Sequence, residues 1–289
     1  MQDLFAEIRK AARNLEKNRY TKTSRLIISL AEKIDKQNGK YGLGVFTQEI
    51  GPLFDTFKNE YEANCPIGQN YRRRCFEEVS KIVMTVLGNV ENEANELVAE
   101  TNNFMDRMQE VKRSISPMMD LFMNLYCKPT RTNQESLIMF NSACQSYLIA
   151  VEGVFGELAK TLYYFIEVLG RNNPSYKEIK KDNIWGILRS CKQIFGISPV
   201  FLENWQEKNH IRNAIAHAQA EFSPEESKVR FFSRDLTSNF TIYDKTMSFE
   251  GFLLIHLELI DAIDSFHYAI ELFRVMNLLT FAYSQKAVS

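Results

Sequence analysis

Arg212, Asn213 and His217 are the residues of this sequence whose types and spacing best fit a chemical role. Histidine exchanges a proton near neutral pH, so His217 is suited to act as a general acid or base. Arginine stays protonated and can place two N–H groups on phosphate oxygens, so Arg212 is suited to bind a phosphate and to stabilise developing charge. Asn213 can orient either group by hydrogen bonding. These types favour chemistry on a phosphate ester, and the alternative is a set of solvated side chains on an exposed helix.

The spacing of apolar residues around these three predicts a helix over residues 201–222. At about 100° per residue, four side chains fall within one narrow stripe that should face the core. They are Ile211, Ile215, Ala218 and Phe222. Asn213 and His217 then project together from the opposite side, and Arg212 lies on the flank with a side chain long enough to swing towards them.

Helical periodicity dominates the rest of the chain and predicts an all-α protein in two parts. The first part, 1–128, is a series of amphipathic helices whose role the sequence does not reveal. A stretch rich in turn formers at 128–134 marks the boundary. The second part, 134–285, begins with a long helix over 136–169 that is rich in aromatic residues.

The clearest β pattern follows the predicted helix of the three candidate residues. Two runs rich in aromatic and β-branched residues, 228–232 and 240–243, predict a β-hairpin. Residues 246–250 offer a cap before a final helix over 249–281. We therefore expect a helical bundle with a small β-hairpin inserted after the helix of the three candidate residues.

The string His-Ile-Arg-Asn-Ala-Ile-Ala-His-Ala over residues 210–218 resembles the HEPN family (higher eukaryotes and prokaryotes nucleotide-binding). The ribonuclease signature of that family is an arginine, four to six residues, then a histidine, often with a polar residue directly after the arginine. Arg212, Asn213 and His217 match its four-residue form.

The resemblance extends beyond this short string. It includes Trp-Gly-Ile-Leu-Arg at 185–189, the hairpin after the string, and Asp-Ser-Phe at 264–266 in the final helix. It covers roughly residues 134–283 and implies a HEPN-like helical bundle there, so the first 130 or so residues are not explained by it.

The resemblance implies an endoribonuclease that works without a metal ion or other cofactor. His217 would help the 2'-OH of RNA attack the adjacent phosphorus, and Arg212 would bind the scissile phosphate. The products would be a 2',3'-cyclic phosphate and a 5'-OH end. Asn213 would orient His217 or a phosphate oxygen. The setting that the resemblance implies is prokaryotic defence or a toxin-like stress response.

Such domains usually form homodimers in which both copies of the motif line one cleft. The small residues Ala216 and Ala220 would permit that close approach, although they fit packing within one chain equally well. In the toxin branch that a nucleotidyltransferase silences, a tyrosine commonly stands two residues after the histidine. This chain has Gln219 there, so that modification is not available. Other members keep the fold as a non-catalytic dimerisation or scaffold module, and a nucleotide-sensing regulator is a third possibility.

Further residues are candidates for binding the RNA substrate. Lys177, Lys181 and Arg189 belong to a basic region inside the second part, and His210 lies seven residues before His217. Basic side chains can hold phosphates, and ordinary solvation is the alternative for each of them.

Composition narrows the remaining classes. The net charge of -1 provides no global field for polyanions, so RNA contacts must be local. The five cysteines include no CxxC pair, which favours reduced thiols and a cytoplasmic location, and no metal-site spacing is found. We expect no membrane segment, and the N-terminal helices could bind a regulatory protein partner.

Overall fold

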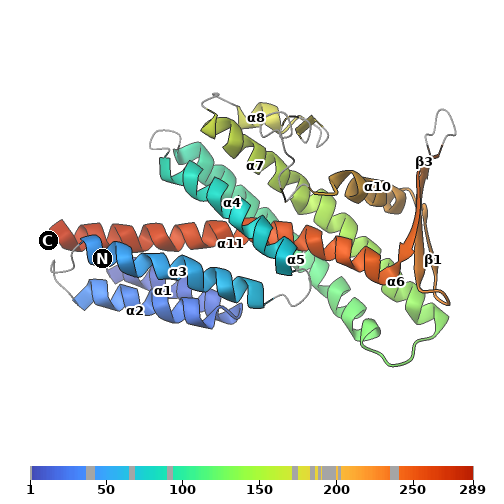
Figure 1. Ribbon diagram of the computed structural model, residues 1–289, viewed down its shortest axis with the longest axis horizontal. Helices are drawn as coiled ribbons and strands as arrows, with labels where there is room; N and C mark the ends of the chain where they lie inside the picture. Colours follow the sequence, from blue (N-terminus) through green and yellow to red (C-terminus); the bar gives the residue numbers. More distant parts are fainter. Residues whose placement is uncertain are drawn as a thin grey trace. The chain divides into compact units, whose positions relative to one another are not determined.

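The computed structural model describes most of the chain. The described residues are 2–36, 43–64, 69–89, 94–170, 175–182, 186–187, 190, 200, 203–234 and 241–288. They are mostly helical, with one small antiparallel sheet (Figure 1), which confirms the mainly-α prediction. A HEPN-specific arrangement remains a proposal.

Two compact units make up the chain, one formed by 1–84 with 265–289 and the other by 85–264. The turn at 128–134, which the sequence marks as a boundary, joins two helices of the second unit. The compact units therefore differ from the predicted limits of 1–128 and 134–285.

The first unit is built from helices around an aromatic core. Its helices are α1 (Gln2–Lys17), α2 (Thr21–Lys36), α3 (Leu43–Ala63), most of α4 (Gln69–Asn89) and the later part of α11 (Phe249–Val288). The rings of Tyr20 and Phe57 stack with centroids 4.7 Å apart, and both lie close to Tyr268. The hydroxyl of Tyr61 lies 2.9 Å from Ser265 Oγ, so this buried polar atom is satisfied.

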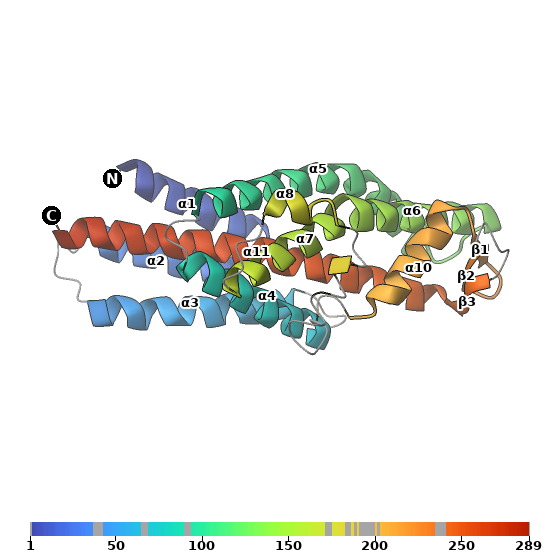
Figure 2. The same ribbon diagram turned by 90° about the horizontal axis from the view of Figure 1, so that it is seen from above.

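The second unit carries the candidate residues. Its elements are α5 (Ala94–Tyr126), α6 (Asn133–Ala150), η1 (Val151–Phe155), α7 (Gly156–Leu169), α8 (Tyr176–Ile179), α10 (Trp205–Ala216), three strands and the start of α11. Helix α6 begins at a capping box, because Thr132 Oγ1 accepts from the Glu135 N–H and the Glu135 side chain accepts from the Thr132 N–H. Helices α5 and α6 then run side by side (Figure 2).

The predicted long helix over 136–169 is confirmed in its course, with one difference. Between α6 and α7 the backbone forms the π-helical turn η1 and then resumes the α form. Such turns add a residue to a helical turn and are frequent at functional sites. The apolar periodicity of the sequence does not reveal this one.

The sheet has three strands where the sequence predicted a two-stranded hairpin. Strands β2 (Lys228–Arg234) and β3 (Thr241–Ser248) pair antiparallel, which confirms the hairpin. An additional strand, β1 (Ala220–Ser223), pairs antiparallel with β2 in the order β1-β2-β3. Its residues had been assigned to a helix, and that assignment was wrong. The ring of Phe222 stacks on Phe140 of α6 with centroids 5.0 Å apart, so burial on the second unit favours the strand.

The final helix starts where the sequence predicts. Ser248 Oγ accepts from the Gly251 N–H at 3.0 Å, which is an N-cap hydrogen bond for α11. The helix continues to Val288, beyond the predicted end at 281.

One helical run, Asn133–Val168, is long and apolar enough to cross a membrane by length and composition, which the sequence reading had not named. Its most apolar window is 56% buried inside the protein. The core helix of a soluble protein shows the same pattern, so the structure is compatible with a soluble protein.

Candidate active site

Helix α10 holds the candidate residues in its last turn and beyond. Its buried side chains are Trp205, Lys208, Ile211 and Ala214. Their spacing of three residues forms one stripe that packs on the second unit, and the Trp205 ring stacks on Phe155 of η1 with centroids 4.7 Å apart. Both views place α10 beside the three strands (Figures 1 and 2).

The helix ends at Ala216, six residues before the predicted end. The Ala218 N–H donates to Ile215 O at 3.1 Å and the Gln219 N–H donates to Ala214 O at 2.6 Å, which is the Schellman pattern of a helix end. Ala218 has a positive φ of 53°. The predicted stripe is therefore wrong beyond Ile215.

The correction extends to the predicted small-residue face. Ala216 is exposed at the end of α10, whereas Ala220 belongs to β1 and is opposite Phe231. The two alanines do not share a helix face, so they provide no argument for a dimer seam.

Ala218 tests this helix end, because a left-handed conformation is strained for an L residue with a side chain. Relief of about 1–2 kcal/mol should outweigh the greater entropy that glycine gives the unfolded chain, about 0.5–1 kcal/mol. Ala218→Gly is therefore expected to raise the free energy of unfolding by up to about 1 kcal/mol in urea denaturation. The matched control, Ala216→Gly inside the helix, should lower it by about 0.5–1 kcal/mol. Equal losses in both variants would contradict the assigned helix end.

Arg212 is held in place by two neighbours. Its Nε and Nη2 lie 2.9 and 2.8 Å from Glu152 Oε1, and its Nη1 donates to Asn213 Oδ1 at 2.7 Å. The side chains of Arg212 and Glu152 are 36% and 50% exposed. An ion pair this exposed contributes little stability, about 0–1 kcal/mol, so its effect is mainly to orient the guanidinium.

Asn213 thus orients Arg212 through its amide oxygen, whereas the sequence reading gave it His217 or a phosphate as partner. His217 caps the carboxyl end of α10, and its backbone N–H donates to Asn213 O at 3.0 Å. Its side chain is exposed, and in the described part of the chain its ring has no hydrogen-bond partner. The imidazole is therefore accessible to a substrate, one turn after the arginine.

The carboxylate that pairs with Arg212 comes from the π-helical turn. In η1, Val151, Val154 and Phe155 are buried while Glu152 is exposed. The turn thus anchors itself in the core and presents Glu152 to α10. The sequence reading weighed Glu152 as a partner of Arg212 but favoured solvent exposure, because a single acidic residue gives no signal for a contact across 60 positions.

Gly153 allows this turn to approach α5 closely. A Cβ at this position would lie 2.9 Å from Cγ2 of Val111, whose branched side chain is stiff. Gly153→Ala is therefore expected to lower the free energy of unfolding by about 1 kcal/mol, since overpacking outweighs the better helix propensity of alanine.

The matched control for Gly153→Ala is Gly51→Ala in α3, where a Cβ would meet nothing within 4 Å. This control should raise stability by about 0.5–1 kcal/mol. Urea denaturation measures both, and a stabilising Gly153→Ala would contradict the close approach.

Lys208 is an anchor of α10 that the sequence reading missed. It is fully buried, and its Nζ donates to Glu203 O at 2.9 Å. The same Nζ lies 3.2 Å from Oε2 of Glu258 on α11, an ion pair without hydrogen-bond geometry. The Tyr147 hydroxyl on α6 donates to the Lys208 carbonyl at 2.8 Å. The lysine could have been found from its place three residues before Ile211 on the buried stripe.

The predicted substrate-binding residues are only partly placed near the candidate site. His210 lies on α10 and stacks on Tyr243 of β3, with ring centroids 4.7 Å apart, and burial lowers the pKa of its imidazole. This ring is therefore less readily charged than a free histidine. Lys177 and Lys181 are exposed in and just after α8. Arg189 lies outside the described residues.

A metal centre has no support among the described residues, where no group of three or more His, Cys, Asp or Glu side chains could hold an ion. His256 is buried and lies 3.2 Å from Ser146 Oγ, and burial lowers its pKa to about 4. It is a neutral core residue at pH 7. The site is therefore defined by Arg212, Asn213 and Glu152, with His217 at its edge.

Comparisons with family models, curated proteins and solved structures found no match. The HEPN resemblance therefore rests on the motif and its helical context.

Proposed function

We propose that this protein is a HEPN-type endoribonuclease that cleaves RNA without a metal ion, in a defence or toxin-like stress response. The observation that carries the proposal is the arrangement at the end of α10. There a guanidinium oriented by Glu152 and Asn213 stands one turn before the exposed imidazole of His217. Arginine and histidine are the types that phosphate binding and proton transfer require.

The proposed reaction is an internal transfer at phosphorus. His217, or its copy in a partner subunit, removes the proton of the 2'-OH as the oxygen attacks the adjacent phosphorus. The bond from phosphorus to O5' breaks, and a second acid returns a proton to the leaving oxygen. Arg212 donates to the phosphate oxygens and stabilises the charge that accumulates on them. The products are a 2',3'-cyclic phosphate and a 5'-OH end.

Two copies of the chain would complete this acid–base apparatus, because one histidine cannot be base and acid in the same instant. A homodimer with a composite site is therefore part of the proposal. Substrate would reach Arg212 by displacing Glu152 from at least one N–H group, which the high exposure of both side chains permits. Lys177, Lys181, Arg189 and His210 are proposed contacts for flanking RNA.

The proposal is tested on the ends of the cleaved RNA. Purified protein is incubated with a labelled single-stranded RNA in excess EDTA, and the fragments are treated with phosphatase and with kinase. We expect 3' fragments that kinase labels directly and 5' fragments that resist phosphatase until acid opens the cyclic phosphate. Fragments with 5'-phosphate ends, or cleavage that EDTA abolishes, would contradict the mechanism.

A non-catalytic scaffold is the second candidate, and exposed apolar side chains favour it. The ends of α5 and α6 that meet at their turn carry Leu121, Met123, Tyr126, Leu137 and Ile138, each at least 40% exposed. Surfaces of this kind often bind other proteins. In that case the Arg212–Glu152 ion pair would be structural only, and no RNA would be cut.

A further inference from the structure

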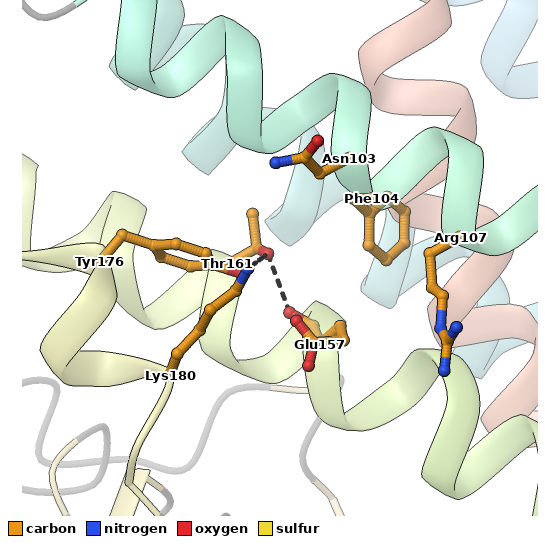
Figure 3. A pocket seen from close by; sticks show the side chains of 7 residues that line it. All are labelled: Asn103, Phe104, Arg107, Glu157, Thr161, Tyr176 and Lys180. Atoms are coloured by element: carbon orange, nitrogen blue, oxygen red, sulfur yellow. Dashed lines mark hydrogen bonds between the residues drawn. The ribbon is translucent and has the colours of Figure 1, made fainter.

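A pocket of about 240 Å³ lies in the second unit between α5, α7 and the end of α8 (Figure 3). It is smaller than the ~300–1,000 Å³ pockets of drug-sized ligands and holds the equivalent of about eight water molecules. Its ligand must therefore be small. Charged side chains of both signs line it, from Arg107, Glu157 and Lys180.

Two buried hydroxyl groups at the pocket have both of their protons committed. Thr161 Oγ1 donates to the Glu157 carbonyl at 2.8 Å, so the Tyr176 hydroxyl, 3.1 Å away, must be the donor to Thr161. Both oxygens keep lone pairs and can only accept. They therefore favour a cation beside them.

Lys180 supplies that cation. Figure 3 shows its amino group directed towards the Thr161 and Tyr176 hydroxyls, and its Nζ lies 5.0 Å from the centroid of the Tyr176 ring. The lysine backbone is fixed as well, since its carbonyl accepts from Lys160 Nζ at 2.7 Å. The ammonium is thus oriented into the pocket with up to three protons to donate.

The remaining polar groups define the charge that a ligand should carry. Arg107 stands at the other side of the pocket in Figure 3, and its Nη1 makes only a long contact of 3.4 Å to the exposed Glu110. The Asn103 amide adds two further N–H donors. Two cations together match a dianion, and the donors outnumber the one side-chain carboxylate, Glu157.

We propose that this pocket binds a small phosphate monoester that carries hydroxyl groups, in the size class of a pentose phosphate. Lys180 and Arg107 hold the phosphate through charge-assisted hydrogen bonds. The Glu157 carboxylate accepts from a hydroxyl of the ligand and so distinguishes the ester from inorganic phosphate. The proposal does not rest on RNA cleavage, because none of these residues belongs to the motif of α10.

The first test measures binding to the full chain with ribose 5-phosphate, using inorganic phosphate and ribose as comparisons at constant ionic strength. We expect saturable heat in calorimetry and a rise in Tm with ribose 5-phosphate, because a ligand that binds only the folded state stabilises it. Inorganic phosphate should bind more weakly, and ribose should give no signal. Absence of saturable binding by ribose 5-phosphate, or equal affinity for inorganic phosphate, would overturn the proposal.

The second test uses variants that keep the fold. Lys180→Ala and Arg107→Ala should each weaken binding of ribose 5-phosphate by about 10- to 100-fold, the loss expected for one charged hydrogen bond. Glu157→Gln should weaken the ester and leave inorganic phosphate unaffected. The matched control is Lys177→Ala, which removes an exposed charge of α8 outside the pocket lining. An equal loss in Lys177→Ala would show attraction by charge alone and would overturn the site.

Discussion

Replacing His217 with alanine is expected to reduce RNA cleavage by about 10²–10⁴-fold, the range typical of a lost general acid or base. The side chain is exposed at the end of α10 and makes no hydrogen bond within the described residues, so its removal should leave the fold intact. The rate is measured with a labelled single-stranded RNA in EDTA, under single-turnover conditions.

The control for this experiment is Gln206→Ala, which removes another exposed side chain of α10 at a distance from the motif. Its cleavage rate should equal that of the unaltered protein, and the Tm of both variants should be unchanged. If His217→Ala still cuts RNA at the original rate, the histidine has no catalytic role and the cleavage has another source.

A large stability effect is expected at the ion pair that anchors α10. Glu258→Ala removes the counter-charge of Lys208, whose ammonium is fully buried, and should lower the free energy of unfolding by about 3 kcal/mol. Lys208→Met replaces the charge with an apolar side chain of similar length and should change stability by less than about 1 kcal/mol in either direction. Urea denaturation at pH 7 compares the two.

The difference arises because an unpaired buried charge costs more than the absence of the whole pair. The Tyr147 hydroxyl bonds to the backbone of Lys208, so that contact persists in both variants. A loss in Lys208→Met larger than that in Glu258→Ala would mean that the lysine contributes through packing alone.

The sequence predicts most of the helices because their apolar spacing is regular and tertiary packing agrees with it. Buried Ile8, Leu30 and Ile34 lie in the predicted amphipathic helices of the first unit. The end of α10 could not be read in this way, since Ala218 is neither glycine nor asparagine and continues the apolar spacing. Phe222 fits that spacing too, and only its contact with Phe140 places it in a strand.

The candidate site could be predicted in its residue types but not in its contacts. Arg212, Asn213 and His217 are found from their chemistry and spacing, which depend on local sequence. Glu152 and Lys208 are not, because their partners are set by packing between helices that lie far apart in the chain. A charged residue on a buried stripe is the one local sign of such an anchor.

The π-helical turn also determines how the second unit can vary in length. One residue fewer between 151 and 155 would restore ordinary α geometry and rotate all that follows by about 100° about the helix axis. Phe165 would leave the interior and Thr161 would turn away from Tyr176. Insertions and deletions here should therefore be far more harmful than substitutions of Glu152, and the phase of α7 relative to α6 is a heritable property of residue count.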